Sequence, residues 1–427
     1  MTGRRLSSLL ASVTAAAAGA SLLTGCGVLP GATGGSREPV TVMTWAPDQT
    51  RATNMPGMPA MAQTYARWVN SQGGIDGHEL RVLTCNEQNT PAGAAACARR
   101  AVRENAVAVV GSYSQNGRAF MAPLEAAGIP YIGGYGLTED EFTSHLSYPV
   151  NGGLAALVAG HGMQLAESCD QVSLVRPDTL AGDRLPRLLD AGLKKASKRG
   201  AVDIPAVEDA TEYTAQATRA RDKAGTEDGC VAAVLGERTQ TFFDSFRRLP
   251  RGAGGAQETS DDDRGSVRIS SVLGSVGQPV IDRTGGARSP FEGAYVTGWY
   301  PEAEDRSWEP MRKVIKEHAF ADNRVDPTDT GVQTTWIAYT VLKEVVESLD
   351  RDTITASRIT EALDRGAQVD TGGLTPKLRW MYEDLLGAPD FPRIVNHEVT
   401  FQVVRKGRLV AQKPGFVDVG PTVTNRG

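Results

Sequence analysis

The residues with the most distinctive chemistry in this sequence are its five cysteines. They stand at positions 26, 85, 97, 169 and 230. In an oxidising compartment thiols pair into disulfides, so an odd number leaves one thiol that needs a separate explanation. The sequence around the first cysteine supplies that explanation.

Cys26 follows a segment with the layout of a secretory signal peptide. Two arginines near the start precede an uncharged, Ala-rich stretch and then Leu23-Thr24-Gly25-Cys26. These last four residues resemble a bacterial lipobox, in which cleavage before the cysteine leaves its thiol attached to a diacylglyceryl group. An uncleaved anchor helix is the alternative, but the stretch is only weakly apolar, which favours removal. We therefore predict a signal peptide over residues 1–25, a lipid on Cys26 that holds the protein on the extracytoplasmic side of the cell membrane, and a flexible tether over residues 26–39.

Signs of catalysis are weak in this chain. The sequence contains no Gly-x-Ser-x-Gly, His-Glu-x-x-His or phosphate-loop motif. Its five histidines are scattered, and the acidic run at residues 261–263 lacks the ligand spacing of a calcium loop, so it is interpreted as a solvated charge run. We expect no catalytic residue, no metal site and no cofactor.

Alternating strand and helix patterns run through most of the chain, and they indicate where the cysteines lie in the fold. The first series predicts strands at 40–45, 79–84, 107–110 and 129–132, with helices at 60–72, 91–103 and 119–127. The second predicts helices at 154–167, 184–197, 213–224 and 242–249, with strands at 171–175, 202–207, 230–235 and 267–273. Beyond them come a strand at 293–300, helices at 308–318, 332–349 and 355–365, a hairpin at 397–412, and a frayed tail at 416–427. Short apolar strands separated by helices indicate two consecutive α/β lobes with parallel sheets.

The four remaining cysteines can pair within the lobes that this pattern predicts. Cys85 ends the second strand and Cys97 lies in the helix that packs back on the same sheet. Cys169 and Cys230 both lie at strand starts, which meet at one end of a parallel sheet. We predict bridges between Cys85 and Cys97 and between Cys169 and Cys230, with free buried thiols as the alternative.

Composition argues against nucleic-acid binding and against a multi-span membrane protein. The chain has 427 residues with 45 Lys and Arg against 50 Asp and Glu, and its net charge of -5 comes without a dense basic stripe, so nucleic acid is not expected as a partner. Mean hydropathy is -0.26, and no long apolar run follows residue 25, which excludes a multi-span membrane protein.

Several short motifs together resemble a known family. Trp68-Val69-Asn70 followed by Gly73-Gly74-Ile75-Asp76-Gly77 resembles the helix-to-strand turn of type I periplasmic binding proteins, and more narrowly of the branched-chain amino acid/amide family of ABC-transporter solute-binding proteins. Other matching pieces follow in the same order, namely Gly111-Ser112, Gly128-Ile129-Pro130, Gly182-Asp183 and Leu378-Arg379-Trp380. The resemblance extends from about residue 40 to residue 412.

The resemblance implies a bilobed α/β protein with two Rossmann-like parallel-sheet lobes joined by a three-strand hinge. By analogy, residues 40–150 and 301–395 form the first lobe, and residues 151–300 and 396–415 form the second. The ligand is expected between the lobes, at the carboxyl ends of the strands.

The resemblance also implies that the loops after the strands hold the ligand. Those loops supply Ser112, Tyr113, Ser114, Gly134, Tyr135, Gly136 and Thr138 in the first lobe, and Ala181, Glu237, Arg238 and Ser275 in the second. Ser114 is equally suited to cap a helix, and the two charged residues are equally suited to a solvated loop. Trp45, at a strand end, and Trp336, where the family places an aromatic residue, are expected either in the cleft or in the core.

Ligand and partners follow from the same resemblance. It implies a monomer that delivers a small amino-acid-like or amide-like solute to the membrane subunits of an ABC importer. Amino-acid binders in the family usually place an acid where this chain has Ser275, so Glu237 is a candidate substitute, while Arg238 would suit an anionic or carbonyl-rich solute. A ligand-sensing or interaction module that signals to a membrane partner is the alternative function.

Overall fold

The structure, a computed structural model, describes residues 37–424 apart from 52, 180–181, 208, 226–227, 251–266 and 389. The predicted signal peptide, Cys26 and most of its tether, Ala181 and the acidic run at 261–263 therefore lie outside the described residues. Among the described helices, none is long and apolar enough to cross a membrane.

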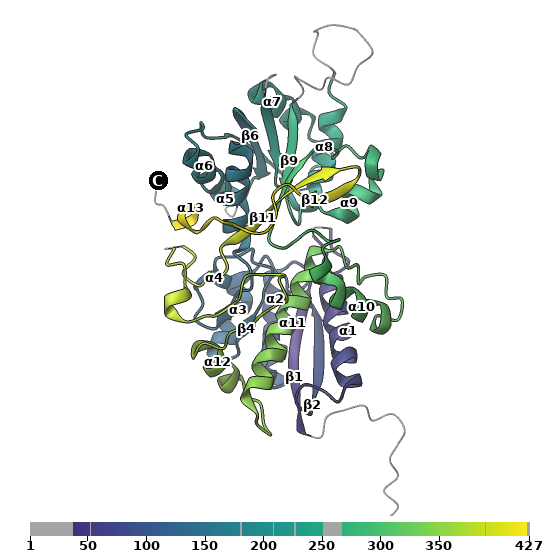
Figure 1. Ribbon diagram of the computed structural model, residues 1–427, viewed down its shortest axis with the longest axis vertical. Helices are drawn as coiled ribbons and strands as arrows, with labels where there is room; N and C mark the ends of the chain where they lie inside the picture. Colours follow the sequence, from purple (N-terminus) through teal and green to yellow (C-terminus); the bar gives the residue numbers. More distant parts are fainter. Residues whose placement is uncertain are drawn as a thin grey trace, which may run out of the picture. The chain divides into compact units, whose positions relative to one another are not determined.

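Five parallel strands in the order β2-β1-β3-β4-β5 form the first sheet (Figure 1). They are β1 (Arg37–Ala46), β2 (His78–Asn86), β3 (Ala108–Val110), β4 (Tyr131–Ile132) and β5 (Ser147–Tyr148). The helices of this lobe are α1 (Gly57–Ser71), α2 (Pro91–Arg103), α3 (Gly117–Ala127), α4 (Asp140–Thr143), α10 (Glu309–His318), α11 (Thr330–Leu349) and α12 (Ala356–Asp364), with the 3-10 turn η4 (Arg306–Trp308).

Helices cover both faces of this sheet, as the continuous apolar character of β1 requires. Successive side chains of a strand point to opposite faces. Val40 and Val42 pack in a cluster with residues of α1 and α11, whereas Met43 and Trp45 pack in a separate cluster with residues of α2 and α3. Both faces of β1 are therefore buried, as expected for a parallel sheet.

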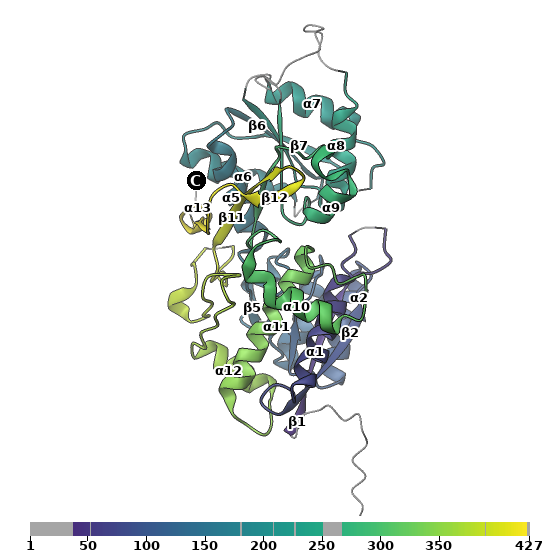
Figure 2. The same cartoon turned by 45° about the vertical axis from the view of Figure 1, so that its right-hand side comes forward.

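The second sheet has the order β12-β11-β10-β9-β8-β6-β7. Its parallel strands are β6 (Gln171–Pro177), β7 (Val202–Ala206), β8 (Gly229–Ala233), β9 (Arg268–Val272) and β10 (Tyr295–Gly298). The antiparallel strands β11 (Glu398–Arg405), β12 (Arg408–Ala411) and β13 (Val417–Asp418) complete it, and Figure 2 shows the yellow hairpin β11–β12 beside the teal elements of this lobe. The helices are α5 (Gly153–Ala166), α6 (Leu185–Lys195), α7 (Thr214–Ala224), α8 (Thr239–Arg247), α9 (Gln278–Arg283) and α13 (Gly420–Thr424), with the 3-10 turns η1 (Gly182–Arg184), η2 (Gly236–Arg238) and η3 (Gly286–Arg288). The two sheets confirm the predicted α/β class with two parallel-sheet lobes.

The chain passes between the two lobes three times. The crossings lie between β5 and α5, between β10 and α10, and between the 3-10 turn η5 (Tyr382–Asp384) and β11. Hydrogen bonds join the first crossing to each of the other two. The Trp299 indole of the second crossing donates to the Gly153 carbonyl of the first at 2.9 Å, and the Asn396 side-chain amide of the third donates to the Val150 carbonyl of the first at 3.0 Å. The three crossings therefore form one connected hinge.

Both predicted disulfides are present. Cys85 in β2 is joined to Cys97 in α2, and Cys169 before β6 is joined to Cys230 in β8, each with a Cα–Cα distance of 5.8 Å. Each bridge lies within one lobe. Neither bridge crosses the hinge.

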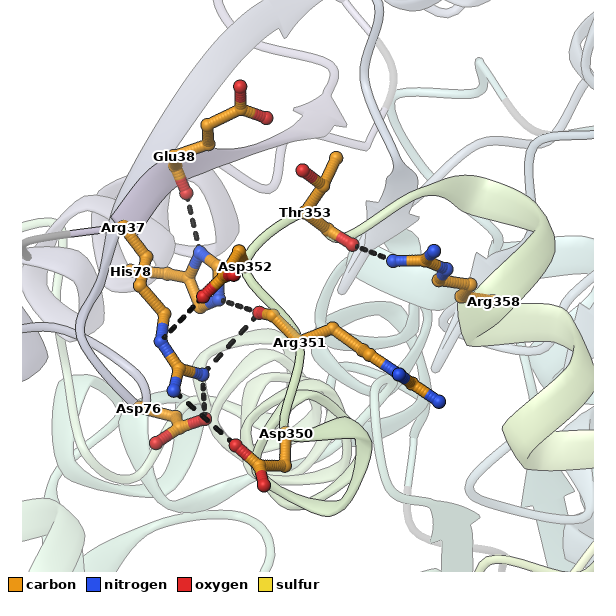
Figure 3. A network of polar contacts seen from close by, with 9 residues as sticks. All are labelled: Arg37, Glu38, Asp76, His78, Asp350, Arg351, Asp352, Thr353 and Arg358. Atoms are coloured by element: carbon orange, nitrogen blue, oxygen red, sulfur yellow. Dashed lines mark hydrogen bonds and ion pairs between the residues drawn. The ribbon is translucent and has the colours of Figure 1, made fainter.

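A polar cluster at the amino end of the first sheet ties the α11–α12 loop to β1 and β2 (Figure 3). The buried ring of His78 lies between two carbonyl oxygens, with Nδ1 2.5 Å from that of Glu38 and Nε2 2.8 Å from that of Arg351. Beside it, the Arg37 guanidinium forms ion pairs with Asp76 at 2.7 Å and with Asp350 at 3.4 Å. His78 therefore has a structural role, far along the strands from their carboxyl ends.

The structure departs from the sequence-based expectations at short elements and at the C-terminus. The elements α4, β5 and α9 were not predicted, because two to six residues are too few to show a period. The prediction of a frayed tail is wrong for Val417–Thr424. There β13 pairs with β11, and Val419 and Thr422 are buried against the second lobe.

Candidate ligand-binding site

A cavity of about 760 Å³ lies where the carboxyl ends of the parallel strands of both sheets meet. In the first lobe the loops after β1, β2, β3 and β4 contribute to its wall, and in the second lobe the loops after β6, β8, β9 and β10 do. Because the peptide groups and side chains that follow parallel strands converge at one edge, open α/β sheets bind ligands in this position. The location and the volume suit a small-molecule site.

The inner wall of the cavity is apolar. Its buried or half-buried apolar members include Met55, Leu137, Leu154, Leu157, Leu185, Val234, Leu273 and Trp299. The charged residues that line it are Arg118, Glu139, Asp140 and Arg184, and each of these is exposed or half-exposed. Charge is therefore confined to the rim and balanced in sign, two acids against two bases.

Three aromatic rings form one side of the cavity. Tyr135 packs edge-on against Tyr113, with ring centroids 5.1 Å apart, and against Trp299 at 5.2 Å. Burial raises the pKa of Tyr113 to about 12 and raises the pKa of Tyr135 well above its ordinary value. Both hydroxyls are therefore protonated at neutral pH and able to donate a hydrogen bond. The Tyr113 hydroxyl accepts one from the Gln115 amide at 3.2 Å, whereas the buried Tyr135 hydroxyl has no partner among the described residues.

Glu141 holds the loop that carries Tyr135. The residue is 2% exposed, and its carboxylate accepts hydrogen bonds from the backbone N–H of Gly136 at 3.1 Å and of Leu137 and Thr138 at 3.0 Å each. Burial raises the pKa of Glu141, and these donors oppose that effect. Glu141 was not predicted as a site residue, although Thr138-Glu139-Asp140-Glu141 matches the Thr-x-x-Glu capping pattern that would have indicated it.

Two polar contacts join the loops of the two lobes at the edge of the cavity. Arg184 of η1 forms an ion pair with Glu139 of the first lobe. The Glu237 carboxylate of η2 accepts a hydrogen bond from the backbone N–H of Asn54 at 3.2 Å. Because the side chains of the ion pair are 39% and 44% exposed, solvent screening limits its contribution to stability to under about 1 kcal/mol.

Five of the predicted binding residues line the cavity. They are Tyr113, Tyr135, Gly136, Thr138 and Ser275. The Ser275 hydroxyl accepts a hydrogen bond from the Gly236 N–H at 3.1 Å, which leaves its own proton able to reach a ligand. Gly136 has φ of +87°, a conformation that suits glycine and lets the chain pass close to the cavity.

Trp45 and Trp336 lie in the core, so their alternative assignment to the cleft is corrected. Trp45 is fully buried and packs edge-on against Phe120, with ring centroids 5.4 Å apart. Trp336 stacks on Trp68 at 5.5 Å under α1. Neither residue lines the cavity. The cause is that α1, α2 and α3 cover the faces to which these rings point.

The remaining predicted residues lie behind or beside the wall. Ser112 and Ser114 are buried behind the wall. The Ser112 hydroxyl accepts a hydrogen bond from the backbone N–H of Trp45 at 3.1 Å, and the Ser114 hydroxyl donates one to the Glu87 carboxylate at 2.9 Å. The α carbon of Gly134 faces Tyr131 and Glu141 rather than the cavity. Glu237 and Arg238 lie next to the wall in η2 without forming part of it, and Ala181 lies outside the described residues.

Some residues of the second lobe line the cavity without having been predicted from the sequence. Trp299, Leu154 and Arg184 line the cavity, and none of them was named as a binding residue. Trp299 lies near the end of a predicted strand as Trp45 does, so the same pattern marks both residues. Only the packing of the helices separates the ring that lines the cavity from the ring that lies in the core.

A protein-family model described as periplasmic binding protein matches residues 50–384. The chain belongs to this family. This periplasmic binding protein also shares its fold with solved structures of low sequence identity. A substrate-binding periplasmic protein from Ralstonia solanacearum has 16% identity and a TM-score of 0.67 over 87% of this chain and 100% of that chain. A fatty acid ABC transporter substrate-binding protein from Thermomonospora curvata has 11% identity and a TM-score of 0.70 over 90% and 94%.

A branched-chain amino acid ABC transporter from Thermus thermophilus with bound valine has 14% identity to this periplasmic binding protein and a TM-score of 0.68 over 90% and 97%. A comparison with curated protein sequences finds no match. The family and the compared structures are those of solute-binding proteins rather than enzymes, and the family implies an extracytoplasmic location.

Proposed function

We propose that this periplasmic binding protein is anchored by lipid on the outer side of the cell membrane and delivers a small solute to the membrane subunits of an ABC importer. The cavity at the strand ends carries the proposal, because loops of both lobes contribute to its wall. A hinge of three crossings would let the lobes part and close around the solute.

The lining favours an amide-like solute over a zwitterionic amino acid. A zwitterion needs a buried acid for its ammonium and a cation or several N–H donors for its carboxylate. The buried polar groups of the described wall are neutral hydroxyls, and its charged groups stay at the rim. The compared proteins cover varied solutes, since the Thermus thermophilus protein has bound valine and a Rhodopseudomonas palustris protein is in complex with 4-hydroxybenzoate.

Filling the cavity should abolish solute binding. Leu154 lies on α5, lines the cavity and is half-buried, so the larger indole of a Leu154→Trp variant has room to extend into the space a solute would occupy. We expect thermal-shift and calorimetric screens of amides and small metabolites to yield binders of the wild-type protein that bind the variant at least about tenfold more weakly, which corresponds to about 1.4 kcal/mol.

Leu349→Trp is the matched control for this experiment. Leu349 is also half-buried and at a helix, but it lies at the end of α11 and does not line the cavity. Its variant should bind as the wild type does. Equal binding by the Leu154→Trp protein would show that the solute binds elsewhere, and an empty screen would count against a transport role.

The lipid anchor makes a separate prediction. A Cys26→Ser variant expressed in a bacterial host should lose the labelled fatty acid that the wild type incorporates, because no other thiol stands at the cleavage position. Labelling of both proteins measures this, together with mass mapping of the amino terminus of the wild type for removal of residues 1–25. An unlabelled wild-type protein that stays in the membrane fraction with residues 1–25 attached would favour the uncleaved anchor helix instead.

A further inference from the structure

The size of the cavity exceeds what a free amino acid needs. Its volume is about 760 Å³. At roughly 30 Å³ per non-hydrogen atom, the share of a water molecule in the liquid, the nine heavy atoms of leucine would occupy about a third of it. Pockets of this volume hold ligands of drug size. The cavity in this structure therefore has room for a solute larger than leucine.

The polarity of the cavity limits what that solute can carry. The deep wall is made of buried aliphatic and aromatic groups such as Leu157, Leu185 and Trp299. Transfer of an ionised group into such surroundings is costly unless a charge pairs with it. At the rim, Arg184 is already paired with Glu139 across the lobes. The described wall thus offers no buried charge to a charged solute.

Tyr135 supplies an unpartnered polar group inside this wall. The residue is 3% exposed, and its hydroxyl has no hydrogen-bond partner among the described residues. The oxygen packs against Gly274 in the loop after β9, so closely that a β carbon there would be 2.5 Å away. A buried hydroxyl without a partner costs free energy, and an acceptor on a solute would remove that cost.

Taken together, these features define a ligand class. Resting on the proposed function, we infer that the solute is a bulky, mainly apolar and uncharged molecule with a carbonyl-type oxygen that accepts a hydrogen bond from Tyr135. The apolar body lies against the leucine and tryptophan side chains, and the acceptor meets the hydroxyl where Tyr135 packs against the backbone of Gly274. Free amino acids and short polar solutes lack the apolar area that this wall would cover.

Two uncharged fluorescent probes test this inference. 6-Propionyl-2-(dimethylamino)naphthalene carries one carbonyl on a naphthalene body, and N-phenyl-1-naphthylamine has a similar body without a carbonyl. Both should bind the wild-type protein with one-to-one stoichiometry and lose binding in Leu154→Trp. Leucine should give no calorimetric heat.

Tyr135→Phe isolates the hydroxyl. This substitution should weaken the affinity for the carbonyl probe by about three- to tenfold, which is the range for one neutral hydrogen bond, and leave the affinity for the carbonyl-free probe unchanged. Its melting temperature should not fall, because the removed hydroxyl had no partner to lose. Tyr339→Phe is the matched control, since the Tyr339 hydroxyl is buried 2.8 Å from that of Thr44 and away from the cavity. That variant should lose stability and keep both affinities.

The outcomes separate the inference from the proposed function. Tight binding of leucine or of another zwitterion together with failure of both probes would overturn the ligand class and leave solute binding intact. An unchanged affinity of the carbonyl probe for Tyr135→Phe would overturn the role of the hydroxyl. Failure of the probes and of every solute in the wider screen would contradict the proposed function itself.

Discussion

Replacing Cys169 and Cys230 together with serine should lower the free energy of unfolding by about 4 kcal/mol. The bridge spans 61 residues of sequence, and a cross-link that closes a long loop removes more conformational entropy from the unfolded chain than a short one does. Both sulfur atoms lie in the buried core of the second lobe, so the variant also places two hydroxyls among apolar neighbours. Urea unfolding of the oxidised wild type and of the variant measures the difference.

The second bridge provides the control for this prediction. Cys85 and Cys97 are 12 residues apart, so their replacement should cost less, about 3 kcal/mol. None of the four cysteines lines the cavity, and variants that remain folded should bind solutes with unchanged affinity. A loss of less than about 1 kcal/mol for the 169–230 pair, or a reversed ranking of the two pairs, would contradict this account.

Acid should destabilise the second lobe through His161. The ring is fully buried in α5, with Nδ1 2.9 Å from the Thr297 hydroxyl and Nε2 3.1 Å from the Ser270 hydroxyl. Burial lowers the pKa of His161 from 6.5 to about 4. Between these two values the unfolded chain binds a proton that the folded chain excludes, so stability is complete above pH 6.5 and falls as the pH drops toward 4. The full loss of unfolding free energy through His161 is about 3 kcal/mol.

A His161→Gln variant separates this effect from other titrations. Burial also raises the pKa of the carboxyls of Glu87 and Glu141, and a carboxyl with a raised pKa gains stability on protonation, which is opposite in sign to the effect of His161. The informative quantity is therefore the difference in unfolding free energy between wild type and variant at pH 7 and at pH 4. We expect the wild type to lose about 3 kcal/mol more than the variant over this interval. Parallel pH profiles for the two proteins would show that His161 is not the cause.

The parts of the fold that the sequence predicted share one property, which is a pattern long enough to carry a period. The helix Thr330–Leu349 and the strand Arg37–Ala46 both contain several repeats of their apolar spacing, and both lie close to their predicted bounds. Ser147–Tyr148 has two residues and no period, and its place at the edge of the first sheet is set by pairing with β4. The segment Val417–Thr424 is held by contacts with β11 and α5, which local sequence does not encode.

The site was predictable to the extent that strand ends define it. Tyr113, Tyr135 and Ser275 follow strands, and the carboxyl-end rule is enough to bring them to the cavity. The rule does not say which face of a sheet an end residue occupies or what covers that face. Trp45 and Trp299 show this, since one is covered by α2 and α3 and the other remains on the cavity wall.

The central claim is that this cavity holds a small solute, and native mass spectrometry of the protein tests it most directly. Wild-type protein incubated with an organic extract of cells should show a population heavier by one small molecule. Under the same conditions Leu154→Trp should show the bare protein mass, and Leu349→Trp should resemble the wild type. Spectra in which the wild type carries no adduct, or in which Leu154→Trp carries the same adduct as the wild type, would contradict the account.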